Sequence, residues 1–388
     1  MPYNFDEIID RKNTNSLKYD FAVERGKPAD VQPLWVADMD LRAPQEVITA
    51  LVTGSQHGIF GYSNVKSDYF APLAQWLHES FDWEVREEWL VRTPGVVFAI
   101  AMAIRALTKK GDSIMIQRPV YYPFSLTIQD NERTLVNSPL IYQDGKYHMD
   151  FSDFEQKIIE KDVKLFLLCS PHNPVGRVWT KAELTRIGDI CHKHSVIVLA
   201  DEIHHEFTFA GHKHHVFADL KPEYRDFTIT CTAPSKTFNL AGLQISHIFI
   251  ANEKLRQLFA QELTKTGYCE SNSLGLLASQ AAYTHGRSWL NQLKTYLAGN
   301  LSLVREMTAA LPGVKLVEPE GTYLVWLDFS ERNLSPQELD ALILHKAGLW
   351  LDKGSMFGPE GNNFQRINIA CPHAELRRAL EKLQKAFR

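Results

Sequence analysis

The sequence predicts an α/β protein in which a mainly parallel sheet carries helices on both faces and a smaller α+β domain is attached. Between about residues 89 and 250, short apolar runs alternate with stretches of helical periodicity, as βαβ units do. After residue 268 the pattern changes to long helical stretches followed by short strands. The chain has 388 residues, and at about 100–200 residues per domain this length suits two unequal domains.

The strands of the larger domain are expected where short runs are apolar and partly β-branched. The clearest is Val163–Cys169 (VKLFLLC), because a continuously apolar run is typical of a strand buried on both faces. The other expected strands are 90–93, 113–117, 195–200, 227–232 and 245–250. Helical spacing predicts helices over 96–108, 122–129 and 180–194.

The smaller domain is expected to begin with two helices, 274–285 and 289–311, the second of which should end at Pro312-Gly313. Three strands follow, at 315–317, 323–328 and 364–369, together with two further helices, at 336–346 and 374–387. We therefore expect a large domain over 49–285, a small domain over 286–388, and an N-terminal segment, 1–48, that packs with the small domain.

Composition excludes several classes of protein. Lys and Arg number 42 against 46 Asp and Glu, so the net charge of −4 gives no support for a nucleic-acid partner or a polybasic membrane surface. The five cysteines are scattered without a C-x-x-C pair, which argues against a disulfide framework or a cysteine zinc site. The chain has no signal-like N-terminus and no apolar run near the ~20 residues of a membrane helix, so we expect a cytoplasmic protein.

The familiar cofactor and catalytic motifs are absent from the sequence. There is no G-x-G pair for a dinucleotide, no P-loop, no G-x-S-x-G elbow and no H-E-x-x-H. Seven of the fifteen histidines lie between His192 and His215. They lack the spacing of a structural zinc site, and we interpret them as a polar helix end and a solvated loop, with no metal.

Three polar residues follow three successive predicted strands. Asn173 comes after the strand at 163–169, Asp201 after the next strand and Lys236 after the one that follows it. Each has an ordinary explanation, as a turn residue, a helix cap or a solvated lysine. Together at one sheet edge, they match the needs of pyridoxal phosphate (PLP): a lysine for the Schiff base, a carboxylate for the pyridinium nitrogen and an amide for the phenolate oxygen.

The motifs around these residues resemble those of the fold-type I, or aminotransferase-fold, PLP enzymes: N-P-V-G at 173–176, A-D-E-I-H at 200–204, S-K-T-F-N-L-A-G at 235–242 and F-Q-R-I-N at 364–368. Three further motifs resemble the MalY/PatB-like C–S lyases, the cystathionine β-lyase subgroup: W-V-A-D-M-D at 35–40, T-P-G-V-V at 93–97 and R-P-V-Y-Y-P-F at 118–124. The resemblance covers nearly the whole chain and implies a homodimer with shared active sites.

The resemblance implies a role for each matching residue. Lys236 would carry the cofactor and act as the proton-transfer base, and Asp201 would keep the ring nitrogen protonated. Asn173 would bond the phenolate oxygen, and Tyr121 would stack on the ring beside the substrate. Arg366 would hold the substrate α-carboxylate with two parallel hydrogen bonds, a geometry that lysine does not offer.

The phosphate would be held mainly by backbone groups. The resemblance places it at the start of a helix, against the amides of Val96 and Val97. The hydroxyl often found three residues before the lysine is missing, so Ser235 or Thr232 is expected to replace it. Tyr62 would reach the phosphate of the neighbouring subunit.

The resemblance also implies the reaction, an elimination that releases a thiol, pyruvate and ammonia from L-cystathionine or a related S-substituted cysteine. Two departures from the transaminase pattern favour this lyase subgroup: His204 stands where transaminases commonly have Tyr, and Gln244 where they have a phosphate-binding Arg. A class I/II aminotransferase on the same fold and a PLP-bound regulatory protein remain the alternatives.

Overall fold

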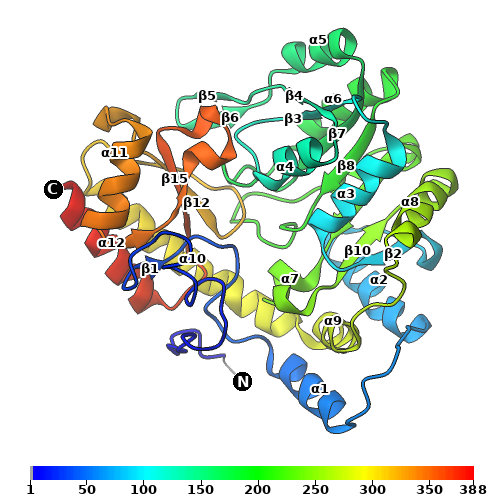
Figure 1. Ribbon diagram of the computed structural model, residues 1–388, viewed down its shortest axis with the longest axis horizontal. Helices are drawn as coiled ribbons and strands as arrows, with labels where there is room; N and C mark the ends of the chain where they lie inside the picture. The colour runs from blue at the N-terminus through cyan, green and yellow to red at the C-terminus, as the bar shows by residue number, and fades with distance from the viewer. Residues whose placement is uncertain (1–2) are drawn as a thin grey trace.

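A seven-stranded mixed sheet forms the centre of the larger part of the molecule, which is described by a computed structural model over residues 3–388. Figure 1 shows this sheet on the right and a smaller sheet on the left. Six of the seven strands run in the same direction and β10 runs antiparallel to both its neighbours, which confirms the predicted fold class. The strand order is β2 (Leu90–Thr93), β10 (Ser246–Phe249), β9 (Thr228–Thr232), β8 (Ile197–Asp201), β7 (Val163–Cys169), β3 (Ser113–Ile116) and β4 (Thr134–Asn137).

Helices cover both faces of the large sheet because successive side chains of a strand point to opposite faces. In β7, Leu165 and Leu167 pack in the core beneath α3 (Val96–Leu107), α4 (Pro123–Asp130) and α8 (Glu253–Lys265). Phe166 and Leu168 pack in the opposite core beneath α5 (Phe151–Lys161) and α6 (Lys181–Lys193). The continuous apolar run that identified this strand therefore results from its burial on both sides.

The smaller sheet is antiparallel, and two long helices pack in the same core as its inner side chains. Its strand order is β11 (Lys315–Val317), β12 (Leu324–Asp328), β15 (Phe364–Asn368) and β14 (Asp352–Lys353), and the helices are α10 (Arg287–Ala309) and α12 (His373–Phe387). The predicted helix at 336–346 is α11 (Pro336–Ala341), which continues as a π-helical turn. Ser335 and Glu338 begin it with a capping box.

Several elements were not among those predicted. They include α1 (Gln45–Gln56), α2 (Ser67–Phe81), α5, α8, the strands β4 and β14, and the hairpin of β5 (Ile141–Gln143) and β6 (Lys146–His148). The helix α9 (Ser273–His285), which was predicted, packs against both α1 and α2. No helix within residues 3–388 has the length and apolarity to cross a membrane.

The N-terminal segment lies against the smaller part of the molecule, where β1 (Gln32–Pro33) pairs in parallel with β13 (Leu349–Trp350). Beyond β1, residues 35–41 form what we call the N-terminal strap. Asn239 bonds both the N–H and the C=O of Met39, and Asn368 donates to two carbonyls of the strap. The strap thus connects the large and small parts, whose boundaries at 48 and 285 stay predictions.

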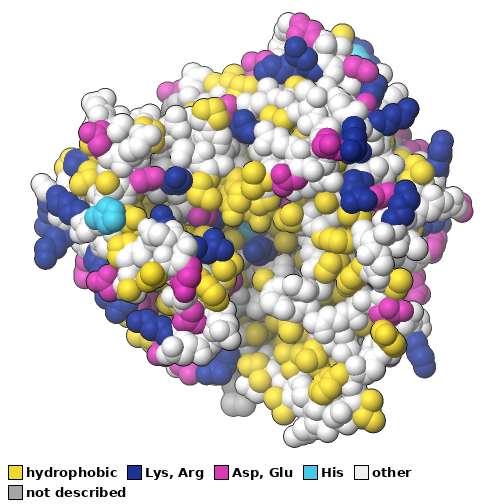
Figure 2. Space-filling model, viewed as in Figure 1, with side chains coloured by type: hydrophobic (Ala, Val, Ile, Leu, Met, Phe, Trp, Pro, Cys, Tyr) yellow, Lys and Arg dark blue, Asp and Glu magenta, His cyan; other side chains and the backbone are white. Residues whose placement is uncertain are grey.

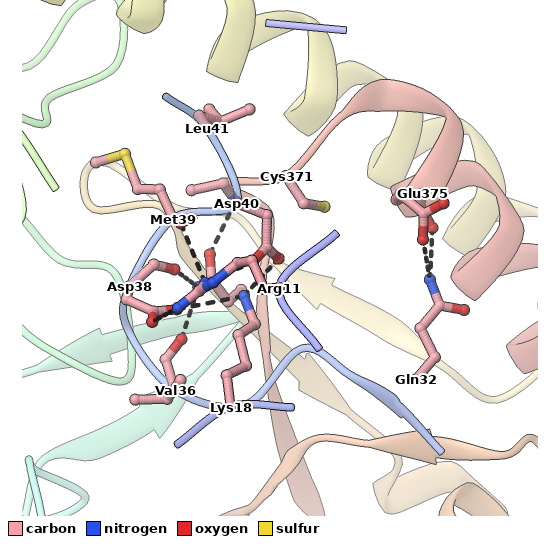
Figure 3. A network of polar contacts seen from close by, with 12 residues as sticks. Arg11, Lys18, Gln32, Val36, Asp38, Met39, Asp40, Leu41, Cys371 and Glu375 are labelled. Atoms are coloured by element: carbon pink, nitrogen blue, oxygen red, sulfur yellow. Dashed lines mark hydrogen bonds and ion pairs between the residues drawn. The ribbon is translucent and has the colours of Figure 1, made fainter. Parts of the chain in front are cut away.

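Four charged side chains fasten the strap to the chain that precedes it (Figure 3). The Lys18 ammonium is buried and lies 2.7 Å from an oxygen of Asp40 and 3.5 Å from an oxygen of Asp38. Arg11 lies 2.7 Å from each of the same two carboxylates. Two cations and two anions thus neutralise one another in a largely buried cluster, where an unpaired charge would destabilise the fold.

We predict that Lys18→Met lowers the free energy of unfolding by about 3 kcal/mol, because Asp40 loses a buried partner. Adding Asp40→Asn should restore much of this loss, since no buried carboxylate is then left short of a cation. Urea unfolding measures both effects, with the exposed Lys12→Met as the matched control, expected within about 0.5 kcal/mol of wild type. A Lys18→Met protein as stable as the control would contradict the prediction.

Candidate active site

A cavity of about 380 Å³ lies at the carboxyl ends of β7, β8 and β9, beside the first turn of α3. This is the edge at which open α/β sheets bind their ligands. Figure 2 shows a hollow in the middle of the molecule, between the larger and smaller parts. Seven of the predicted site residues line the cavity: Val96, Val97, Tyr121, Asn173, Asp201, Ser235 and Lys236.

Lys236 lies on the short helix α7 (Pro234–Thr237), just after β9. Its ammonium donates a hydrogen bond of 2.7 Å to the carbonyl oxygen of Ala37 in the strap. Burial lowers the pKa of Lys236 from 10.5 to about 8, while the charges of Asp38 and Asp201 oppose this shift. Near pH 8 the amine is therefore poised between its cationic form and the neutral form that attacks carbonyl groups.

Asp201 ends β8 and is buried at the floor of the cavity. Burial raises its pKa to about 7, although the Ile203 N–H donates to it at 3.2 Å and Lys236 favours the charged form. Such a carboxyl group gains most from a cationic N–H partner inside the cavity, because that partner would offset its lost hydration.

Asn173 connects the cavity to Arg366 of β15. The Arg366 guanidinium is 2% exposed and donates 2.8 Å hydrogen bonds to Oδ1 of Asn173 and to the carbonyl oxygen of Trp35, and it also pairs with Asp352. Because Oδ1 of Asn173 already accepts from Arg366, its Nδ2 is the end available to a ligand. Arg366 is thus a buried residue next to the cavity rather than part of its lining.

The first turn of α3 supplies an anion site at the other end of the cavity. The N–H groups of Val96 and Val97 belong to the turn whose amides have no partner within the helix. The helix has 12 residues, so its dipole adds to these amides. Ser235 lines the same cavity and offers a hydroxyl.

Tyr121 and Tyr62 occupy different places. The backbone N–H of Tyr121 donates to the carbonyl oxygen of Asn173 at 2.9 Å, so its ring is held in the wall of the cavity, and burial raises the pKa of its phenol. Tyr62 lies between α1 and α2, is 96% exposed and is not among the cavity-lining residues. Its expected action in a neighbouring subunit stays a prediction.

Sequence reasoning missed several contributors to the site. The carbonyl of Ala37 accepts from both Lys236 and, at 3.1 Å, the Tyr323 hydroxyl, and Asp352 pairs with Arg366. Every residue has a backbone carbonyl, so the residue type does not show that the carbonyl of Ala37 is used, although Ala37 lies inside the W-V-A-D-M-D motif. Nothing near Asp352 in the sequence identifies it.

The histidines of the histidine-rich region lie in two different environments, one inside the cavity and one outside it. His204 lines the cavity with its ring edge-on to Tyr323, and burial holds its pKa well below the usual range, so it is neutral. His214 is bonded to Glu202 at 2.9 Å, away from the cavity lining. Within the described part of the chain, no group of three His, Cys, Asp or Glu is arranged to hold a metal ion.

The chain matches the model of the aminotransferase class I and II family over residues 30–383. It is 40% identical to cystathionine beta-lyase PatB of Bacillus subtilis over 385 residues, 99% of this chain and 100% of that protein. A PLP-bound putative aminotransferase from Clostridium difficile superposes with a TM-score of 0.97 at 43% identity, covering 100% of both chains. A PLP-bound C–S lyase from Staphylococcus hominis superposes with 0.93 at 33% identity, covering 100% and 98%.

The residues of the cavity fit PLP, the cofactor of these relatives. The buried Asp201 carboxyl has a single backbone N–H as its hydrogen-bond donor among the described residues and suits a protonated ring nitrogen. Nδ2 of Asn173 suits a phenolate oxygen, and the first turn of α3 suits a phosphate. Lys236 is the sole lysine in the lining and has an amine reactive toward an aldehyde.

We predict that Lys236 in the cofactor-free protein reacts with trinitrobenzenesulfonate, an electrophile that only neutral amines attack, along a pH curve with its midpoint near 8. Burial lowers this pKa, so the reaction should rise through pH 8 and level off where ordinary lysines are still charged. Peptide mass spectrometry of the labelled protein gives the curve.

Asp38→Asn should move that midpoint to lower pH, because the negative charge of Asp38 favours the cationic amine. The exposed Glu46→Gln serves as the control and should leave it in place. A wild-type midpoint near 10.5, the usual pKa of lysine, would show that burial does not lower the pKa of Lys236.

Proposed function

Because the chain belongs to the class I and II aminotransferase family, in its MalY/PatB-like subgroup, we infer that it is a PLP-dependent carbon–sulfur β-lyase. The observation that carries this is the meeting of Lys236, Asp201 and Asn173 in one cavity, in a chain 40% identical along its whole length to a cystathionine β-lyase. The substrates are L-cystathionine or related S-substituted cysteines, and the products are a thiol, pyruvate and ammonia.

Lys236 and Asp201 do the central work. When bound, PLP supplies an electron sink for the Cα of the amino acid attached to it. Asp201 keeps a proton on the ring nitrogen and so maintains that sink, since its buried carboxylate is stabilised by the cation. The Lys236 amine would take the proton from Cα, and its lowered pKa suits a base at neutral pH.

Arg366, Asn173 and Tyr121 orient the substrate and cofactor. Arg366 meets the α-carboxylate from its buried position between Asn173 and Asp352, which fixes the guanidinium plane before substrate binds. Asn173 and Tyr121 both line the cavity, where Asn173 would donate to the cofactor phenolate and the Tyr121 ring would hold the cofactor ring. Such prior positioning reduces the entropy cost of reaching the reactive geometry.

The carbon–sulfur bond breaks after the Cα proton has left. The electron pair of the Cα–H bond forms the Cα–Cβ double bond, and the Cβ–S pair departs with sulfur as a thiolate. Lys236 would hold the abstracted proton at Nζ. Water then hydrolyses the released three-carbon fragment to pyruvate and ammonia, which balances the reaction.

The active enzyme is a homodimer in this proposal. Hydrophobic side chains gather over α1 and α9 on the lower part of the face in Figure 2, and exposed large ones include Val52, Ile59, Phe60 and Leu277. Val97 belongs both to this exposed set and to the cavity lining. A second copy that covers the patch would bring its own Tyr62 toward the phosphate end of the cavity.

A cytoplasmic location also belongs to the proposal. All five cysteines are free thiols, and four of them are buried. Cys169 lines the cofactor cavity itself, and burial raises its pKa, so it behaves as an inert thiol. A reducing compartment suits such a set.

The cofactor-loaded protein should absorb visible light and release pyruvate and thiol from L-cystathionine. Lys236→Ala removes both the covalent attachment and the base, so we expect the absorbance band to be lost and the rate to fall at least about 10³-fold. Lys254→Ala, on the surface of α8, is the matched control. A colourless wild type in excess PLP, or conversion of a 2-oxo acid to an amino acid without thiol release, would contradict the lyase proposal.

Tyr62→Phe should weaken PLP affinity about 10-fold or more, because it removes a hydrogen bond to a charged phosphate. Equilibrium dialysis of PLP measures this, and sedimentation should give a dimer for both wild type and variant. Tyr142→Phe, whose hydroxyl bonds Asp328 at 3.0 Å away from the cavity lining, is the control. A monomeric wild type, or unchanged affinity in Tyr62→Phe, would refute the shared site.

A further inference from the structure

We propose that a second cavity, on the far side of Arg366 from the cofactor cavity, binds the part of the substrate that leaves as a thiol and selects leaving groups that carry a carboxylate. The inference rests on the proposed lyase function and deepens it. The cavity measures about 190 Å³ and lies between residues 25–35 and 340–365.

Two stacked indole rings line this second cavity. Trp35 follows β1 and Trp350 ends β13, and their rings lie 4.5 Å apart with 12° between the planes. Leu344, Leu351 and Met356 add further apolar surface. Methylene and thioether groups pack well on such a surface, which therefore suits the chain attached to a cysteine sulfur.

Two cations border the rings. The guanidinium of Arg25 lies 5.3 Å from the centre of the Trp35 ring, and the ammonium of Lys27 lies 6.0 Å from that of Trp350. Within residues 3–388, neither has a carboxylate within ion-pair distance. Both cations line the cavity and are available to an anionic group of a ligand.

The acidic residues of the cavity already have partners. Asp352 pairs with the buried Arg366, and Asp340 lies 3.9 Å from Lys353 and accepts a 2.8 Å hydrogen bond from Gln365. The opposite charges within each pair cancel, so the net charge of the cavity comes from the two cations Arg25 and Lys27. A carboxylate is the complementary group, and Arg25 can bind it with two parallel hydrogen bonds.

Arg366 joins this cavity to the cofactor cavity. Its guanidinium bonds Asn173, which lines the cofactor cavity, and also Trp35 and Asp352, which line the second one. Burial raises the pKa of Tyr122, and the charges of Arg366 and Arg25 both oppose that shift. The Trp35 carbonyl that accepts from Arg366 belongs to a residue that lines the second cavity, so we place the sulfur substituent of a substrate held at Arg366 in that cavity.

The test compares two substrates that differ in the leaving group. L-Cystathionine carries a distal carboxylate and S-ethyl-L-cysteine does not. In Arg25→Met and Lys27→Met, the ratio of kcat/KM for cystathionine to that for S-ethylcysteine should fall about 10-fold, mainly through the KM for cystathionine, because each variant removes one charged partner. Arg86→Met is the matched control, since Arg86 also lies over an indole, that of Trp89, but lines neither cavity.

An equilibrium measurement gives a second readout. Lys236→Ala loaded with PLP cannot take the Cα proton, so calorimetry can follow L-cystathionine binding without turnover. Adding Arg25→Met should lower this affinity about 10-fold. An unchanged substrate ratio, or unchanged affinity in the calorimeter, would overturn the leaving-group site. A wild type that releases pyruvate from neither substrate would instead overturn the proposed lyase function.

Discussion

The hydrogen bond between Arg366 and Asn173 is the contact on which the arrangement of the active site depends. Arg366 belongs to the smaller sheet and Asn173 follows a strand of the larger one, so this bond fixes the two parts relative to each other at the cavity. A buried guanidinium needs several partners, and the Trp35 carbonyl and Asp352 bond its terminal nitrogens, while Nε has no partner among the described residues. In the proposed function, cofactor and substrate recognition therefore share one buried cation, that of Arg366.

Burial also tunes the two groups that carry the chemistry, in opposite directions. It raises the pKa of Asp201 to about 7 and lowers that of Lys236 to about 8, because low polarity disfavours either charge. The two pKa values lie close together around neutral pH, so small changes in the cavity change the protonation of Asp201 and Lys236. A cationic cofactor ring offsets the cost of the buried Asp201 charge and returns it to the form that the reaction needs.

The sequence was informative where function depends on side chains at strand ends. Asn173, Asp201 and Lys236 follow three buried apolar runs, and parallel strands bring such positions to one edge. The sequence did not identify contributions from backbone atoms or from pairs of residues that interact across different strands. The Ala37 carbonyl has no signature in residue type, and Asp352 meets Arg366 through antiparallel pairing of β14 with β15, strands separated by an irregular connection.

The strap explains why a segment outside both sheets matters to catalysis. Its residue Trp35 gives a carbonyl to Arg366 and a ring to the second cavity, while Ala37 gives a carbonyl to Lys236. The balanced charges of Arg11, Lys18 and the strap carboxylates keep these groups in register. In the proposed function, this one short segment touches the base, the arginine that binds the α-carboxylate and the leaving-group cavity, so a substrate that fills that cavity would contact the same segment that holds the groups acting on its Cα.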